Sequence, residues 1–277
     1  MKLNKSTLKT IDILNLVATG SQGLTITEIS QQLAIPKSTT YQILQTLVEA
    51  GILEVDRNKT FRFGLRFYEI ALPACDQMDL RREARPIMED LCTKTGESIH
   101  MATHDKGQIV YLEQVEGPAL LRISAILGSR GPMHCTAMGK AILAGLPEEE
   151  VRGITGGGDL PLETANTIRT HDELLEDLRE VRYRGYAIDE EELLPDIACV
   201  AAPIFSRDEI GPIAAVTIVG HHSRMPSNRI AFLGKQVIEA ALKISRRLGY
   251  KGDRPYTIYQ GERSGTGNRK SGASVEG

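Results

Sequence analysis

Residues 24–64 read LTITEISQQLAIPKSTTYQILQTLVEAGILEVDRNKTFRFG, and this stretch decides the fold of the front of the chain. Thr25 and Glu28 have the spacing of a capping box, in which each side chain accepts a hydrogen bond from the other residue's backbone amide, and apolar residues follow at helical intervals. Pro36 ends this first helix, because proline drives the residue before it out of the helical region. A second helix follows and stops at Gly51, a residue that accepts left-handed backbone. The order of these features predicts a helix-turn-helix.

The residues that follow have the pattern of a basic β-hairpin. Segments 52–55 and 60–63 alternate apolar and polar side chains, as half-buried strands do, and the intervening Asp-Arg-Asn-Lys is rich in turn-forming residues. A hairpin in this place is the wing of a winged helix-turn-helix. Its basic side chains suit contact with phosphates, and these are Arg57, Lys59 and Arg62.

The outer face of the second helix is polar, and its residue types suit DNA. Lysine and hydroxyl side chains reach phosphates, glutamine reaches base edges, and a recognition helix presents its N-terminal half to the major groove. An ordinary helical pair with a solvated outer face is the alternative, but the capping box, the turn, the glycine stop and the basic hairpin in this order favour DNA binding. We therefore expect DNA contacts from Thr25, Lys37, Ser38, Thr39, Tyr41, Gln42, Gln45, Arg57, Lys59 and Arg62.

Composition agrees with a regulator in two parts. The chain has 277 residues, of which 41% are hydrophobic, and this length suits about two domains. The net charge of -3 divides unevenly, because residues 1–66 hold eight Lys/Arg against five Asp/Glu and the rest of the chain is acidic. A basic N-terminal part and an acidic remainder suit a protein whose two parts bind different partners, one of them nucleic acid.

The sequence also predicts the compartment and the absence of cofactors. There is no N-terminal apolar segment of the signal-peptide type and no apolar run long enough to cross a membrane. The four cysteines are scattered without metal-ligand spacing, which favours reduced thiols in a cytoplasm and no structural zinc. We expect a cytoplasmic protein with no cofactor and no membrane partner.

The remaining pattern predicts an α+β domain behind the winged helix. An opening helix is expected at 6–19. Beyond the wing, helices are expected at 65–78, 80–94, 135–144, 172–184 and 228–248, and strands at 98–103, 108–115, 120–126, 185–190, 197–205 and 212–219. Strands on both sides of a helical middle favour an α+β sheet over a doubly wound one. The expected parts are a winged helix-turn-helix domain at 1–66, a linker helix at 67–79, an effector-binding domain at 80–250 and a disordered tail at 251–277.

The whole pattern resembles the IclR family of bacterial transcription regulators. The resemblance rests on the block at 24–53, on PMHCTAMGKAILA at 132–144 and on RGYAIDEEELLPDIACVAAPIF at 184–205, in the family's order and spacing. It implies a GAF-like α/β effector domain behind the winged helix and a small organic acid as the usual effector. It also implies a homodimer or homotetramer on a palindromic DNA operator.

A helix start at the middle block suits the binding of an acid. The first amides of a helix lack partners within it and form the positive end of the dipole, and the small Ala137 and Gly139 permit close approach. By resemblance, the amides of Ala137 and Met138 hold the acid. The other residues that the resemblance assigns to the effector pocket are the polar Asp189, Cys199 and Thr217, the apolar Leu120, Ile123 and Ile197, and Val219.

Two departures from the family pattern predict a roomier and less polar pocket. Val219 stands where family members often place a hydroxyl, and Gly131 stands where a larger apolar side chain is common. We therefore expect an effector bulkier than pyruvate, such as an aromatic or longer-chain acid. The alternative for the pocket residues themselves is structural: Cys199 as a small core residue, Asp189 as one charge of an acidic turn, and His134 as a hydrogen-bond partner near its helix start.

Three classes of function remain open from the residues. A ligand-responsive transcription regulator of a catabolic operon is favoured, and the sequence leaves open whether it represses or activates. A winged-helix-fused enzyme would need an activated nucleophile at Cys135 or Cys199, and the sequence lacks the GxSxG, GxxxxGK[ST], HExxH and post-strand GxGxxG motifs. A metal-responsive sensor would have to be built from His100, His104, Cys135 and Cys199, which have no ligand-pair spacing. We expect no catalytic activity and no metal.

Overall fold

The computed structural model describes residues 3–20, 23–76, 79–118, 126–156, 158–207 and 211–256, without the side chains of 73–79. The chain divides into two compact units, residues 1–78 and 79–277, and each is described by itself. No helix in the described ranges is both long and apolar enough to span a bilayer.

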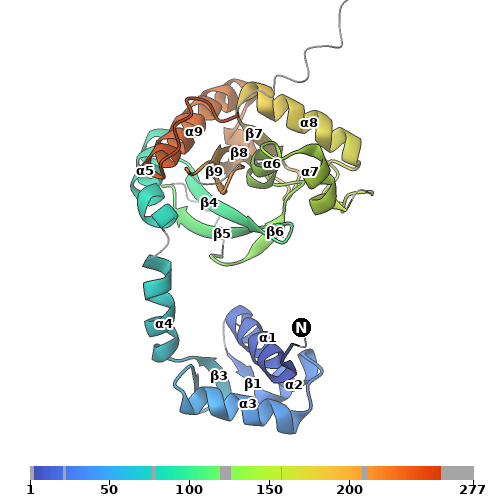
Figure 1. The fold of residues 1–277 in the computed structure, drawn as a ribbon, viewed down its shortest axis with the longest axis vertical. Helices are drawn as coiled ribbons and strands as arrows, with labels where there is room; N and C mark the ends of the chain where they lie inside the picture. The colour runs from blue at the N-terminus through green and yellow to red at the C-terminus, as the bar shows by residue number, and fades with distance from the viewer. Residues whose placement is uncertain are drawn as a thin grey trace, which may run out of the picture. The chain divides into compact units, whose positions relative to one another are not determined.

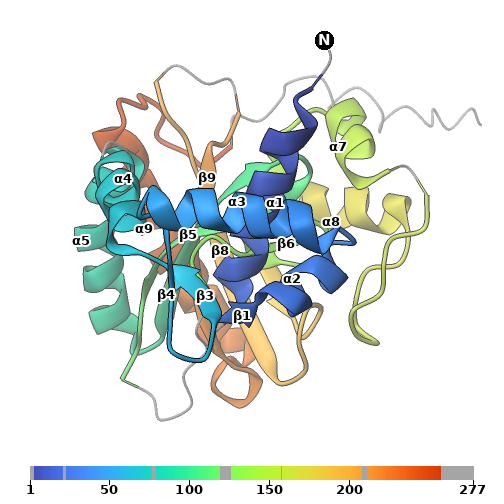
Figure 2. The ribbon, with the colours of Figure 1, turned by 90° about the horizontal axis from the view of Figure 1, so that it is seen from below.

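The first unit is a winged helix-turn-helix, as predicted (Figures 1 and 2). A three-stranded antiparallel sheet of order β1-β3-β2 packs with the helices over a core that includes Ile13, Ile29 and Leu44. The short strand β1, which pairs with the wing strand β3, was not predicted. The elements are α1 Lys5–Thr19, β1 Leu24–Thr25, α2 Ile26–Gln32, α3 Lys37–Glu49, β2 Leu53–Val55, β3 Thr60–Phe63 and α4 Leu65–Asp76.

Local hydrogen bonds explain why these helices begin and end where they do. The backbone amide of Thr25 donates to Glu28 Oε2 at 2.7 Å, and the amide of Glu28 donates to Thr25 Oγ1 at 3.4 Å, so the predicted capping box is present. Ala34 has a φ of 51° in the turn before α3, and Gly51 has a φ of 71° after its end. Left-handed backbone is cheap only for glycine, so Gly51 ends α3 as the sequence predicts.

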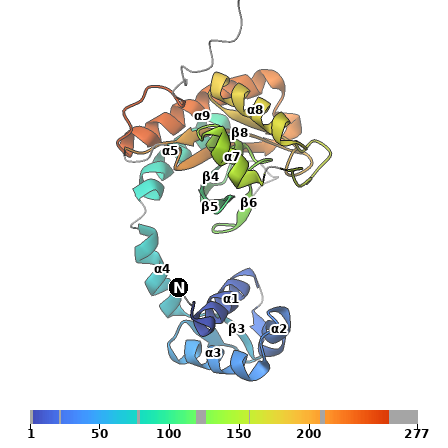
Figure 3. The same ribbon diagram turned by 45° about the vertical axis from the view of Figure 1, so that its right-hand side comes forward.

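The second unit is an α+β domain around one antiparallel sheet of six strands, in the order β6-β5-β4-β9-β8-β7 (Figure 3). Helices α5 and α9 cover one face, and α6, α7 and α8 lie on the other. The elements are α5 Asp79–Thr95, β4 Ser98–Asp105, β5 Gln108–Val115, β6 Arg130–Pro132, α6 Ala137–Leu143, α7 Glu148–Thr155, α8 His171–Arg184, β7 Ala187–Glu190, β8 Ile197–Ile204, β9 Ala214–His221, the 3-10 turn His222–Arg224 and α9 Ser227–Arg247.

The second unit differs from the sequence prediction in three places. Most of the strand expected at 120–126 lies outside the described residues, and the strand that pairs with β5 at its edge of the sheet is the short β6. Helix α7 was not predicted. Residues 251–256, assigned to the tail, are described, and the buried Tyr256 donates a hydrogen bond from Oη to the carbonyl of Ala141 at 2.8 Å. Packing in this unit therefore extends beyond residue 250.

Candidate functional site

The outer face of α3 is the candidate DNA interface. Thr40, Ile43 and Leu44 are buried in the first unit, which turns the intervening side chains outward. Lys37, Ser38, Tyr41, Gln42 and Gln45 are exposed, and Thr39 is half-buried, so the polar face that the sequence predicts is present.

Several of these side chains are held by contacts within the unit. Lys37 Nζ donates to Thr27 Oγ1 at 3.0 Å, and Gln45 Nε2 donates to Tyr41 Oη at 2.9 Å. The Thr25 hydroxyl donates to Glu28 Oε2 at 2.7 Å, so its first role is to cap α2. These contacts fix the directions of the α3 side chains before any DNA arrives.

The wing is shaped by one aspartate. Asp56 Oδ1 accepts from the amides of Asn58 and Thr60 at 2.9 and 3.0 Å, and its other oxygen accepts from Arg62 at 2.8 Å. Arg57 and Lys59 at the hairpin tip are exposed. Arg62 therefore forms an ion pair within the wing, whereas the side chains of Arg57 and Lys59 at the tip are exposed.

The second unit contains a cavity of about 280 Å³ beside the start of α6. Of the predicted effector residues, those that line it are Ala137, Met138, Asp189, Ile197, Cys199, Thr217 and Val219. Leu120 and Ile123 lie outside the described residues. The cavity is also lined by residues that the sequence did not predict for an effector pocket, namely His100, Tyr111, Ile126, Ser129, Thr136, Leu193 and Leu194.

Strand register explains how distant residues meet at this cavity. Asp189 on β7 pairs with Cys199 on β8, which pairs with Val219 on β9, so the three form one row across the sheet. Thr217 pairs with His100 on β4 in the next row toward the other edge. Because alternate residues of a strand share a face, these side chains line the same wall.

The start of α6 forms the opposite wall. Thr136 accepts a hydrogen bond from the amide of Gly139 at 3.1 Å and donates to the carbonyl of Pro132 at 2.7 Å. The first amides of a helix have no partner within it, and this cap takes only that of Gly139. The amides of Ala137 and Met138 belong to the same turn, beside the cavity that their residues line.

Asp189 is a buried acid at this cavity, with 3% of its surface exposed. Its Oδ1 accepts from the amide of Glu192 at 2.8 Å. Burial raises the pKa of Asp189 to about 7, with a further rise from the charge of Glu192, against the backbone hydrogen bonds and the charge of Lys140. Near neutral pH this side chain can therefore hold a proton and donate a hydrogen bond, or lose it and accept one.

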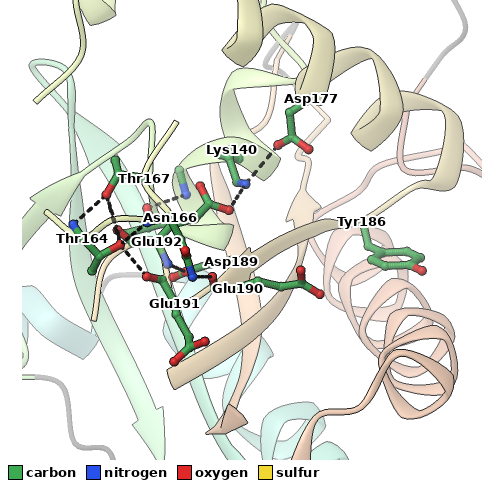
Figure 4. A network of polar contacts seen from close by, with 12 residues as sticks. Lys140, Thr164, Asn166, Thr167, Asp177, Tyr186, Asp189, Glu190, Glu191 and Glu192 are labelled. Carbon is green, nitrogen blue, oxygen red and sulfur yellow. Dashed lines mark hydrogen bonds and ion pairs between the residues drawn. The ribbon is translucent and has the colours of Figure 1, made fainter. Parts of the chain in front are cut away.

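The one lysine of α6 is not among the residues that line the cavity and lies in a polar network with Asp177 and Glu192 (Figure 4). Lys140 is 1% exposed, and its Nζ lies 2.5 Å from Glu192 Oε1 and 3.0 Å from Asp177 Oδ2. These carboxylates outweigh burial and keep the pKa of Lys140 above its ordinary value. Lys140 thus ties α6 to α8 and to the segment after β7.

The same network anchors the segment that carries Leu193 and Leu194 to the cavity. The hydroxyl of Thr164 donates to the carbonyl of Glu191 at 2.7 Å, and that of Thr167 donates to the carbonyl of Glu192 at 2.7 Å (Figure 4). Sequence reasoning missed these threonines, since nothing local in the sequence brings them to the end of β7.

Cys135, Cys199 and His134 do not have the environment of a reactive group. Burial raises the pKa of the Cys135 thiol to about 12 and that of Cys199 well above its ordinary range, whereas a nucleophilic thiol needs a lowered pKa. His134 Nε2 lies 2.8 Å from the carbonyl of Pro161, a structural contact. In the part of the chain that the structure describes, no three His, Cys, Asp or Glu side chains group as a metal site.

Two models of one protein family together match most of the chain. Residues 6–57 match the IclR helix-turn-helix domain, and residues 73–246 match the bacterial transcriptional regulator IclR C-terminal family. The transcriptional repressor IclR of Escherichia coli (strain K12) is 32% identical over 248 residues, or 88% of this chain and 90% of its own length.

Solved structures of similar fold cover both units. The crystal structure of the Thermotoga maritima IclR is 30% identical with a TM-score of 0.73, covering 89% of this chain and 100% of that one. An IclR homolog from Microbacterium hydrocarbonoxydans, solved in complex with 4-hydroxybenzoate, is 23% identical with a TM-score of 0.79 and covers 88% of this chain and 99% of that one. At that identity, the second likeness concerns the fold alone.

Proposed function

The chain belongs to the IclR family of bacterial transcriptional regulators, and on that premise we propose that it is a repressor of a catabolic operon, switched by a small organic acid. Members of this family regulate transcription and are not enzymes. They bind DNA and small-molecule effectors. The observation that carries the proposal is the cavity at the start of α6, lined by seven of the residues that the sequence predicts for an effector.

We propose that the acid binds with its carboxylate at the amides of Ala137 and Met138 and faces Asp189 across the cavity. The helix start favours a negative group, and Asp189 can supply or accept one hydrogen bond depending on its proton. The DNA contacts are assigned to the exposed face of α3 and to the tip of the wing.

The size of the cavity favours an effector bulkier than pyruvate. A cavity of about 280 Å³ with Val219, Ile197, Leu193 and Leu194 in its wall suits a ring or a chain of several carbons. The Microbacterium protein of similar fold was solved with the aromatic acid 4-hydroxybenzoate, and this acid is the ring-acid probe that we choose. Gly131 contributes less than the sequence suggested, because it is not among the lining residues and a side chain there would meet Ile109.

The switch requires that the acid bind two arrangements of the protein with different affinity. We propose a homodimer or homotetramer in the cytoplasm on a palindromic operator, with the spacing of the two DNA-binding heads set through α4. A twofold protein reads two half-sites at a fixed spacing, so a small change in that spacing alters DNA affinity.

Calorimetric titration tests the class of effector. We expect 4-hydroxybenzoate or a similar ring acid to bind at least about tenfold more tightly than pyruvate or glyoxylate, since a small acid leaves most of the apolar wall unfilled. Tighter binding of the two small acids would contradict the proposed class while leaving the proposed site intact.

Single substitutions test the division into two modules. Asp189→Ala is expected to abolish the acid's effect on DNA binding while DNA affinity without acid stays within about twofold. Lys37→Ala and Gln42→Ala are expected to do the reverse and to weaken DNA binding by roughly 10-fold or more, because each removes a phosphate or base contact. Fluorescence anisotropy with a duplex selected by the protein from a random library gives both quantities. Equal damage to both activities by every substitution would overturn the two-module account.

A further inference from the structure

Strand β5 contains a bulge between a cavity residue and a residue that holds α5. Ala102 of β4 pairs with Tyr111, and the next residue back, Met101, pairs with Glu113, so Leu112 is an extra residue in β5. In a regular strand Tyr111 and Glu113 would share a face, whereas one inserted residue moves them to opposite faces. Tyr111 accordingly lines the cavity, and Glu113 reaches α5.

Glu113 is a buried carboxylate clamped by two arginines of α5. It is 4% exposed; its Oε2 accepts from Arg81 Nη2 at 3.0 Å and Nε at 3.3 Å, and its Oε1 accepts from Arg85 Nη1 at 3.1 Å. Charge-assisted bonds from a planar guanidinium are directional as well as strong. The position of Glu113 therefore fixes the position of the first turns of α5.

The two ends of this short path lie at functionally different places. Tyr111 packs edge-to-face against His100 in the cavity wall, with ring centroids 6.1 Å apart. Helix α5 begins at Asp79, the first residue of the second unit and thus next in the chain to the first. Only Leu112 separates Tyr111 from Glu113, so a shift of the backbone at Tyr111 has one residue to cross before it reaches the carboxylate that holds α5.

We propose that Glu113 is a positioning residue, which couples the occupancy of the cavity to the start of α5 through the bulge in β5. The inference rests on the proposed function, because the signal it carries is the binding of an acid beside Tyr111. The coupling is assigned to a contiguous set of packed and hydrogen-bonded groups. Only a measurement of the coupling free energy can test such an assignment.

The chain offers a matched control in a second glutamate of the same kind. Glu97 is 2% exposed, and its carboxylate accepts from Arg224 at 3.0 and 2.7 Å and pairs with Arg229 at 3.0 Å. Arg229 also donates to the carbonyl of Thr95, so this cluster holds the other end of α5. Loss of either glutamate's charge disturbs a buried carboxylate with two arginines. Glu113 lies in the same strand as Tyr111, across the bulge, and holds the start of α5, whereas Glu97 lies just before β4 and holds the end of α5.

The test compares Glu113→Gln and Glu97→Gln in the full chain. Calorimetry with 4-hydroxybenzoate gives acid affinity, and anisotropy with the selected duplex gives DNA affinity with and without the acid. In Glu113→Gln we expect acid affinity and acid-free DNA affinity within about threefold of the wild type, and an acid effect on DNA affinity reduced to less than about twofold. Glu97→Gln should keep the wild-type acid effect. An unchanged effect in Glu113→Gln, or equal loss in both variants, would overturn the proposal.

Hydrogen exchange gives a readout that needs no effector. Tyr111→Ala is expected to speed amide exchange in the first turns of α5 at least about fivefold. The same substitution made in the Glu113→Gln variant should increase the exchange rate much less. Tyr111→Phe serves as the conservative variant and should leave exchange there unchanged. If Tyr111→Ala acts equally in both backgrounds, Glu113 does not carry the coupling, whatever acid the protein binds. Failure of the wild type to bind acid or DNA, with this exchange pattern intact, would instead contradict the proposed function.

Discussion

Gly139→Ala is expected to be the most damaging single-methyl change in the second unit, with a loss of about 3 kcal/mol or more in the free energy of unfolding. A Cβ at residue 139 would overlap the carbonyl oxygen and the Cα of Met133 and would lie 2.6 Å from the carbonyl carbon of Met133. These are backbone atoms, so no side chain can move aside. Relief requires α6 to shift, which moves the amides of Ala137 and Met138 at the cavity. Urea denaturation and calorimetry with 4-hydroxybenzoate measure both effects.

Gly153→Ala is the matched control for this prediction. Gly153 lies inside α7, and a Cβ there meets nothing within 4 Å. Inside a helix, alanine is more favourable than glycine by up to about 1 kcal/mol. Gly153→Ala should therefore be at least as stable as the wild type. If Gly139→Ala were tolerated as well as Gly153→Ala, the close packing of α6 on Met133 would not be needed to form the cavity.

Lys140→Met is expected to destabilise the protein by about 3–5 kcal/mol, because it leaves the buried carboxylate of Glu192 without its cation. Lys140 Nζ contacts both Glu192 and Asp177, and Lys140 and Glu192 are buried. Methionine keeps most of the volume of the side chain, so the loss reports charge and hydrogen bonding more than a cavity. Chemical denaturation at neutral pH measures it.

The stability lost in Lys140→Met is expected to depend on pH. Burial already raises the pKa of Glu192, against the opposing charge of Lys140. Removal of that charge raises the folded-state pKa further, so the variant binds protons more tightly when folded than when unfolded. Its stability should therefore recover as the pH falls from 8 to 5, and the gap to the wild type should narrow.

The exposed ion pair of Lys94 with Asp90, at 2.7 Å, provides the comparison. Lys94→Met should change stability little at any pH, since solvent screens that pair. A loss in Lys140→Met as small as that of Lys94→Met, or one that grows at low pH, would contradict the account of the network.

The local parts of the fold could be predicted from the sequence, because short-range chemistry determines them. The capping box of Thr25 and Glu28, the stop at Gly51 and the hairpin around Asp56 each depend on residues a few positions apart. The burial of Thr40, Ile43 and Leu44 follows from helical periodicity, and so does the exposure of the DNA face.

The cavity could be predicted only in part, because its walls come from distant strands. The lining residues within the blocks that carry the family resemblance, such as Ala137 and Asp189, were predicted from that resemblance. His100 reaches the cavity through its pairing with Thr217, and Tyr111 through the bulge at Leu112. Simple alternation would have placed Tyr111 and Glu113 on the same face of the sheet. In the structure Tyr111 lines the cavity and Glu113 reaches α5 on the other face, because of the bulge.

The buried charges were also beyond local reasoning. From the sequence PMHCTAMGKAILA alone, Lys140 would be expected to face solvent. Its burial depends on Asp177 of α8 and on Glu192 after β7, which are distant in the sequence. The same holds for Glu113 and Glu97, whose arginines come from elements far away in the sequence.

If an acid in the cavity beside α6 controls DNA binding, the coupling between the two sites must act in both directions. The most direct test is the affinity of 4-hydroxybenzoate for the free protein and for the protein saturated with the selected duplex, both measured by calorimetry in one buffer. The account predicts a difference of at least about fivefold, equal to the factor by which the acid changes duplex affinity. Equal affinities of the acid for the free and the DNA-bound protein would contradict it.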